Sequence, residues 1–124
     1  MKSDIREAKG SVLVYTRKPI QGLYPSHLAY SVHMAYSGDG TTCVALNQNY
    51  GILFASATVS CINTLNEKGL KSPYLFHTAD GGFGIAAVRV NADGSRDDES
   101  KGKVLLWTSE DLYHFNEIGL LDLH

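Results

Sequence analysis

The sequence predicts an all-β fold built from about two small antiparallel sheets, and three observations support this prediction. Short apolar runs recur along the 124 residues, and one of them alternates between its two faces. Turns that contain glycine and aspartate or asparagine separate these runs. The chain also resembles itself when it is shifted, without gaps, so that Ser37 falls on Ser109.

The predicted strands are short and follow one another closely. Residues 28–36 alternate with a period of two, which is a strand signal, although Leu28, Val32 and Tyr36 would also align on a helix. A helix is therefore the alternative prediction for residues 28–36. A short helical turn is expected within 62–70. The other predicted strands lie at 12–15, 51–54, 73–76, 85–90, 104–107 and 118–121.

The turns between the apolar runs indicate that the strands are joined as hairpins. Residues 37–40, 79–82 and 91–94 each place glycine beside aspartate or near asparagine. These residue types tolerate the positive φ that tight turns require. Strands separated by such turns are typical of antiparallel sheets.

The internal repeat extends this prediction to the whole chain. Both copies contain a strand that ends in an arginine, Arg17 or Arg89, then a loop of equal length and a strand that ends in Ser-x-Asp. Repeated sheet units of this size are typical of β-propellers. We therefore predict one partial β-propeller domain over 1–124, with blade one at about 10–60 and blade two at about 70–122.

The Ser-x-Asp elements at 37–39 and 109–111 have a structural interpretation. Short polar side chains can hydrogen-bond the backbone of a tight turn and so hold a hairpin together. Four residues after each aspartate, the chain is expected to return to the core, with Phe115 in one copy and Cys43 in the other.

Composition and charge exclude several classes of partner. A formal net charge of −2 creates no field that would attract nucleic acid or an anionic membrane, and no apolar run is long enough to span a bilayer. The N-terminal residues do not resemble a secretory signal, so the chain is intracellular or its signal has been removed, and the compartment stays open. Cys43 and Cys61 are expected to be buried free thiols, and a bridge between them is the alternative.

Four segments together resemble the opening blades of glycoside hydrolase family 43. They are the Ser-Gly-Asp-Gly element with the Ala-Leu-Asn that follows it at 37–47, the Glu-Lys-Gly-Leu-Lys-Ser-Pro-Tyr-Leu-Phe run at 67–76, the Asp-Gly-Gly-Phe-Gly-Ile run at 80–85 and the Leu-Leu-Trp-Thr-Ser-Glu-Asp-Leu run at 105–112. The resemblance implies a five-bladed propeller that acts on arabinose- or xylose-containing glycans. It covers residues 10–122, which is about two fifths of such a ring.

The catalytic residues that this resemblance implies are missing from the chain. Family members are inverting enzymes whose carboxylates activate water, protonate the leaving oxygen and orient the sugar. Their aspartates occupy Asp-Pro steps, whereas the matching step here is Ser72-Pro73. The equivalent step of the first blade falls before Met1. The glutamate that serves as the general acid in the family belongs to a later blade. We therefore expect no catalytic residue in this chain.

A carbohydrate could still bind at the surface that would face the propeller axis. Guanidinium, ammonium and hydroxyl groups beside aromatic rings such as Tyr74 or Trp107 suit sugars. The alternative is that these rings belong to the core and that the arginines are structural. The candidate sugar-binding residues are Lys71, Ser72, Arg17 and Arg89.

Other chemical motifs have structural interpretations. Residues 82–87 fit the pattern G-x-G-x-x-A, but strand and turn formers follow where a nucleotide-binding helix would be required. His27 and His33 lack the spacing of metal ligands, and the acidic run at 97–99 is expected to be a solvated hairpin tip. We expect no metal and no cofactor.

Three functions from different classes remain open. The chain is part of a carbohydrate-active propeller that is inactive alone, a non-catalytic carbohydrate-binding module, or a scaffold that associates with itself. The expected partners are arabinose- or xylose-containing glycans, further copies of the chain, or the remaining blades of a parent protein. Unpaired strand edges would drive such association.

Overall fold

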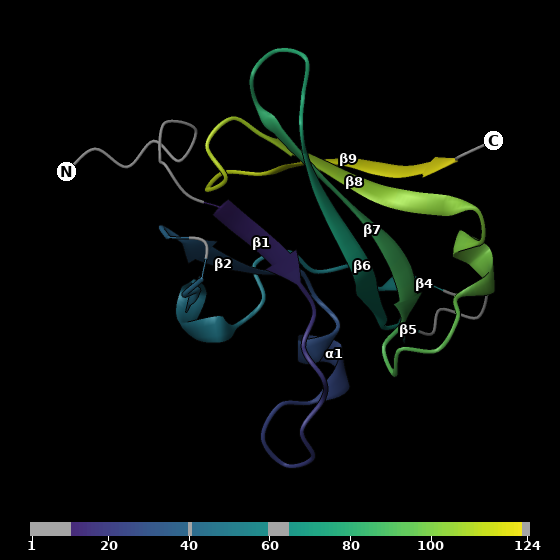
Figure 1. Ribbon diagram of the computed structural model, residues 1–124. Helices are drawn as coiled ribbons and strands as arrows, with labels where there is room; N and C mark the ends of the chain where they lie inside the picture. Colours follow the sequence, from purple (N-terminus) through teal and green to yellow (C-terminus); the bar gives the residue numbers. More distant parts are fainter. Residues whose placement is uncertain (1–10, 40, 60–64, 123–124) are drawn as a thin grey trace.

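The computed structural model describes residues 11–39, 41–59 and 65–122, and about half of them belong to antiparallel sheets (Figure 1). The first sheet contains β1 (Ser11–Tyr15), β2 (His33–Ser37) and β3 (Val44–Ala45) in this order. The second contains β6 (Lys68–His77), β7 (Phe83–Asn91), β8 (Lys103–Ser109) and β9 (Asn116–Asp122). A small pair consists of β4 (Thr58–Val59) and β5 (Leu65–Asn66), and the short helices are α1 (Ser26–Ala29), η2 (Asn47–Asn49) and η3 (Asp98–Ser100).

The two sheets repeat one register at the interval that the sequence predicts. Ser11 lies opposite Ser37 where β1 pairs with β2, and Phe83 lies opposite Ser109 where β7 pairs with β8. The ladders between β2 and β3 and between β8 and β9 are related by the same shift. The connection between the first two strands of each repeat also holds a short helix at the same place, α1 or η3. The all-β fold and its two antiparallel sheets are confirmed.

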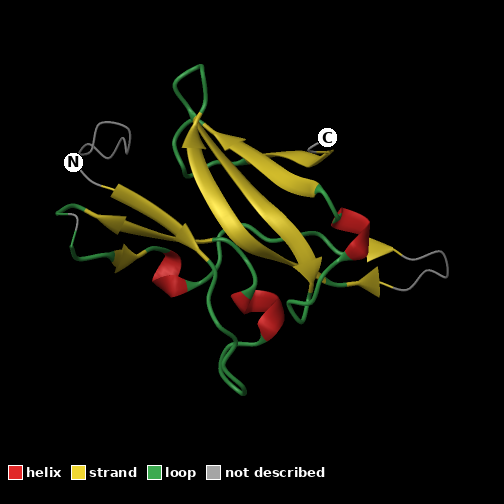
Figure 2. Cartoon of the chain, turned by 45° about the vertical axis from the view of Figure 1, so that its right-hand side comes forward, coloured by secondary structure: helices red, strands yellow, loops and turns green. Residues whose placement is uncertain are grey.

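The sheets differ at one edge and meet there. The second sheet has a further strand, β6, which pairs with β7, whereas β1 pairs only with β2 among the described residues. β1 and α1 contact β6, so the sheets lie side by side (Figures 1 and 2). The Leu70 amide donates a hydrogen bond to the Tyr30 carbonyl at 2.8 Å, which joins β6 to the segment after α1.

The hydrophobic core forms where the sheets pack together. Alternate residues of β7 and β8 point into it, as the strand period of two requires. Trp107 is almost fully buried there, which supports the core alternative for this ring. β2 and β6 add Met34 and Leu70 to the same cluster.

Two predicted elements are wrong in part. Residues 26–29 form α1, and β2 begins only at His33, because Ala29 and Tyr30 pack against β6 instead of extending the sheet. No helix occupies the described part of 62–70, since pairing with β7 draws residues 68–70 into β6. Residues 62–64 lie outside the described residues.

The remaining predicted strands are present, with one exception. Residues 12–15, 73–76, 85–90, 104–107 and 118–121 all lie within strands. Segment 51–54 forms only an isolated bridge between Leu53 and Val32. The amide of Ile52 donates to the Val32 carbonyl at 2.7 Å, so this segment covers the start of β2 without extending a sheet.

The prediction of a free thiol is confirmed for Cys43, but the prediction that this thiol is buried is wrong. Cys43 is a free and exposed thiol, because β3 is short and lies at the edge of its sheet. The equivalent residue of the second repeat, Phe115, is partly buried and packs against the core, whereas Cys43 does not. Cys61 lies outside the described residues. In the part of the chain that the structure describes, no helix is long and apolar enough to cross a membrane.

Candidate functional site

The Ser-x-Asp elements form the same turn in both sheets. Asp39 accepts hydrogen bonds from the amides of Thr42 and Thr41 at 2.8 and 2.9 Å. Asp111 accepts the corresponding bonds from the amides of His114 and Tyr113 at 2.8 and 2.9 Å. These donors favour the ionised carboxylate, so they lower the pKa of Asp39 to about 2 and that of Asp111 as well. The structural interpretation of these elements is confirmed.

The four candidate residues do not form one site. Arg17 belongs to a cluster beside the first sheet, while Lys71 and Ser72 lie on β6 and Arg89 lies on β7. The Arg17 amide donates a hydrogen bond to the Ala29 carbonyl at 3.2 Å, and the Leu70 amide donates to the carbonyl of the adjacent residue, Tyr30. Residues 29–30 therefore connect Arg17 to the part of β6 that contains Lys71. Arg89 takes part in a separate polar network.

Arg17 is surrounded by polar and aromatic side chains that we call the Arg17 cluster. Its guanidinium lies 4.1 Å from the centre of the Tyr24 ring, and its Nη1 donates to the Asn49 carbonyl at 2.8 Å. The Tyr15 hydroxyl donates to Asn49 Oδ1 at 2.6 Å. The cluster consists of Tyr15, Arg17, Tyr24, His33, Asn49 and Tyr50.

His33 anchors the buried side of the Arg17 cluster in its neutral form. Its Nδ1 lies 3.0 Å from the Ser31 carbonyl, which can only accept, so Nδ1 carries the proton. Its Nε2 then accepts from the Tyr24 hydroxyl at 2.6 Å. Burial lowers the pKa of His33, which keeps the ring uncharged near neutral pH. Because His33 is fully buried, it positions Tyr24 rather than meeting a ligand.

The exposed side of the Arg17 cluster offers binding groups, and none of the six described residues that form the cluster is a carboxylate. Arg17 and Asn49 are partly exposed, and the Tyr50 ring is about half exposed at 51%. Residues 47–49 all have a positive φ, which is 64° at Asn49. In this conformation the Asn49 carbonyl points towards Arg17 and accepts its hydrogen bond. A guanidinium, an amide and an open ring can bind a sugar by hydrogen bonds and stacking.

Ser72 lies at an irregularity in β6. The register between β6 and β7 shifts between Lys71 and Tyr74, and Ser72 has a φ of 55°. A non-glycine residue rarely adopts this conformation, and such bulges redirect side chains. The Ser72 side chain is exposed, while the Lys71 ammonium lies 4.9 Å from the centre of the Tyr30 ring.

Arg89 and Asp97 are parts of a buried ion-pair network. Asp97 accepts from Arg89 Nε at 2.9 Å and from the Ser100 hydroxyl at 2.7 Å, and it lies 3.2 Å from Lys68 Nζ. Burial raises the pKa of Asp97, but the bonds from Ser100, Lys68 and Arg89 outweigh it and lower that pKa to about 2. The prediction that residues 97–99 form a solvated tip is therefore wrong for Asp97, because its carboxylate is buried in ion pairs with Lys68 and Arg89.

The remaining sequence motifs have structural explanations. Residues 83–91 form a strand, so no helix follows Gly84 and the nucleotide-binding alternative is excluded. Tyr74 is exposed and stacks on Phe76 with ring centres 6.0 Å apart, so it is not a core residue. Among the residues placed by the structure, no group of three or more His, Cys, Asp or Glu could hold a metal ion.

Sequence reasoning missed most of the Arg17 cluster. Tyr15, Tyr24 and Asn49 come from a strand, a loop and η2, and the Tyr15–Asn49 bond joins residues 34 positions apart. No local pattern signals such a contact. The turn at 47–49 was not predicted either, and its asparagines, which tolerate a positive φ, were the available signal. No family model, no curated protein and no solved structure matches the chain.

Proposed function

We propose that the chain forms two blades of a carbohydrate-active β-propeller and binds sugar without hydrolysing it. The observation that carries this proposal is the common register of the two sheets, in which the pair Ser11 and Ser37 recurs as the pair Phe83 and Ser109. Repeated antiparallel sheets that pack side by side are the architecture of a propeller. The resemblance to glycoside hydrolase family 43 supplies the sugar class, namely arabinose- or xylose-containing glycans.

Ser72 supports the absence of hydrolysis. Inverting glycosidases require a carboxylate to activate water and a second one to protonate the leaving group. A serine at the bulge of β6 is exposed but offers no such group. Lys71 and Ser72 can still donate hydrogen bonds to sugar hydroxyls, as can Arg17 and Asn49.

Binding of arabino- and xylo-oligosaccharides tests this function. Titration calorimetry of the folded chain is expected to show saturable binding that Arg17→Gln weakens at least fivefold, while Lys18→Gln, which alters an exposed neighbour, has no effect. Nitrophenyl arabinosides and xylosides should release no nitrophenol. Failure to bind any of these sugars would refute the binding function, and release of nitrophenol would refute its non-catalytic character.

Self-association is a second candidate function, and the edge of β1 favours it. Within the described ranges, β7 pairs with both β6 and β8, whereas β1 contacts β6 but pairs only with β2. Open edges bind further strands, and the Leu13 side chain on β1 is 52% exposed. Light scattering after size exclusion should show an oligomer that Leu13→Lys dissociates. A concentration-independent monomer would contradict this candidate.

A further inference from the structure

A pocket of about 270 Å³ lies between β7 and the connection that leads to β8, away from the Arg17 cluster. We propose that this Arg89 pocket binds a small molecule through a carboxylate or phosphate group. Its walls carry the cationic side chains of Arg89, Arg96, Lys101 and Lys103.

The pocket arises because the sheet opens at this end. The ladder between β7 and β8 stops at Ala87 and Leu105, although β7 continues to Asn91. Val90 forms a bridge with Arg96, after which the chain leaves the sheet through η3 and returns at Lys103. The excursion leaves a hollow beside the valines of β7 and β8. Arg89, Ser100 and Asp97 hold this loop in place through buried hydrogen bonds.

The first sheet has a different residue at the position that borders this hollow. The equivalent arginine, Arg17, is covered by the ring of Tyr24, which is only 4% exposed. The residue equivalent to Tyr24 in the second repeat is Arg96, whose side chain is exposed. A packed tyrosine in one repeat is thus replaced by an open, cationic position in the other.

The charges around the Arg89 pocket favour an anion. Its lining includes four cationic side chains and one carboxylate, Asp97, which is already paired with Arg89 and Lys68. Among the described residues, no carboxylate lies within ion-pair distance of Arg96 or Lys101. Both side-chain hydrogen bonds of Arg89, to Asp97 and to Ser100, are donated by Nε. Charge-assisted hydrogen bonds from these groups suit an oxyanion.

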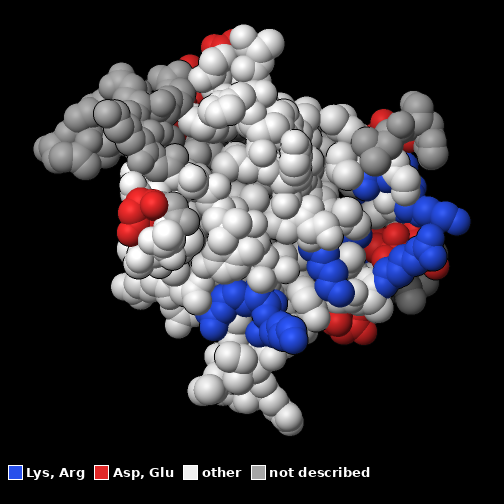
Figure 3. Space-filling view, viewed as in Figure 1, with Lys and Arg blue, Asp and Glu red and all other residues white. Residues whose placement is uncertain are grey.

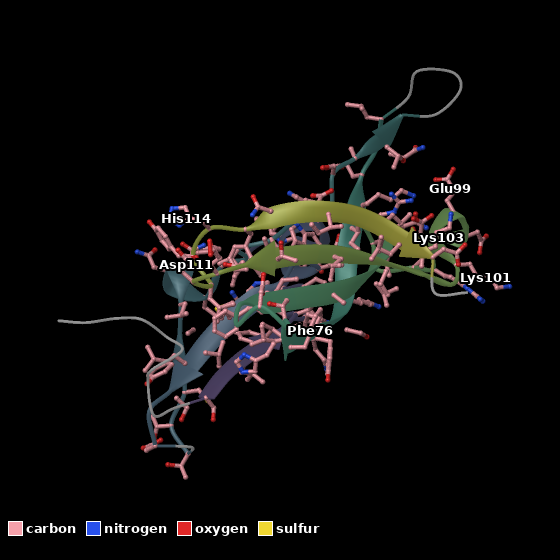
Figure 4. All side chains as sticks on the ribbon, turned by 90° about the horizontal axis from the view of Figure 1, so that it is seen from above. Phe76, Glu99, Lys101, Lys103, Asp111 and His114 are labelled. Carbon is pink, nitrogen blue, oxygen red and sulfur yellow. The ribbon has the colours of Figure 1, made fainter. Side chains whose placement is uncertain are left out.

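Three further acidic residues, Glu67, Asp98 and Glu99, line a neighbouring hollow that shares Arg96 and Asp97 with the Arg89 pocket. Glu99 lies 3.9 Å from Lys68 Nζ there. Figure 3 shows Lys and Arg side chains gathered with Asp and Glu at this end of the molecule. Figure 4 places Lys101 and Lys103 at the opposite end of the sheet from Asp111 and His114. The anion site is therefore separate from the Ser-x-Asp turns.

The apolar part of the lining sets the shape of the ligand. Val88, Val90 and Val104 supply much of the wall, and Val88 is 39% exposed. Apolar surface that a ligand removes from water contributes to its affinity. The pocket therefore suits an oxyanion on a compact apolar body better than a bare anion of the same charge.

Titration of the isotope-labelled chain at low ionic strength tests the proposal, with sodium phosphate, acetate and benzoate as probes. Saturable shifts of the amides at 88–90 and 100–104 are expected, with benzoate binding at least threefold more tightly than acetate. Phenyl phosphate, which carries the same ring as benzoate, is a fourth probe. Tighter binding of phenyl phosphate than of benzoate would assign the anion as a phosphate, and the reverse order would assign it as a carboxylate.

Charge-removing variants decide whether the pocket itself is responsible. The double variant Arg96→Gln with Lys103→Gln should weaken binding at least tenfold while keeping the circular dichroism spectrum of the parent, because neither side chain is buried. Lys18→Gln serves as the control and should bind like the parent. Shifts that never saturate, or equal affinity of the parent and the double variant, would overturn the proposal.

Discussion

Replacing Asp97 by asparagine removes the central charge of the network that joins β6, β7 and η3. The parent side chain is buried and bonds Arg89, Ser100 and Lys68. The fold lowers the pKa of Asp97 from 3.8 to about 2, so the ionised carboxylate contributes roughly 2.5 kcal/mol to the free energy of unfolding. Removing one partner of a buried ion pair costs about 3 kcal/mol or more. We therefore expect Asp97→Asn to lower the free energy of unfolding by about 3 kcal/mol at pH 7.

The stabilisation by Asp97 should depend on pH in a definite direction. Because the pKa of Asp97 is lower in the folded chain, its stabilisation is fully present above about pH 4 and is lost as the pH falls towards 2. Urea unfolding followed by the fluorescence of Trp107, the single tryptophan, measures it. The adjacent exposed residue supplies a control, Asp98→Asn, which should change stability by less than about 0.5 kcal/mol. A loss for Asp97→Asn below about 1 kcal/mol, or one that does not shrink at low pH, would show that the ion pairs of Asp97 do not stabilise the fold.

Three further substitutions test other parts of the structure by the same unfolding measurement. Ser109→Ala should cost about 1–2 kcal/mol, because the buried Leu112 amide loses its acceptor at 2.8 Å, and an unchanged stability would contradict the turn assignment. Tyr24→Phe should cost about 1–3 kcal/mol, because buried His33 loses its hydrogen-bond donor, whereas no loss would mean that water replaces the hydroxyl. Ser72→Gly should stabilise the chain by about 0.5 kcal/mol, since glycine tolerates the φ of 55°, and destabilisation would show that the serine side chain is needed for the bulge.

The repeat in the sequence predicted more of the fold than any single segment. An ungapped shift that lays Ser37 on Ser109 implied equal loops and equal hairpins, and the register of both sheets follows it. Ser-x-Asp was interpretable because its chemistry is local: the aspartate bonds amides two and three residues further along the chain. Features determined by neighbours in sequence were therefore predictable.

Features determined by distant neighbours were not. Residues 28–29 have strand periodicity but turn into α1, because this segment packs against β6, which comes much later in the chain. Asp97 looked like part of an exposed acidic run, yet Lys68 and Arg89 from two strands bury it. The Arg17 cluster likewise depends on Asn49, whose position the local sequence around Arg17 does not reveal.

Cross-strand nuclear Overhauser effects test the central claim that both halves are copies of one antiparallel sheet. We expect contacts between the backbones of Leu13 and Ala35, and equivalent contacts between those of Ile85 and Trp107. Both pairs should be observed together in the same sample. A register displaced by one residue in either sheet, or the absence of strand contacts around Ala35, would contradict the repeat and the propeller architecture inferred from it.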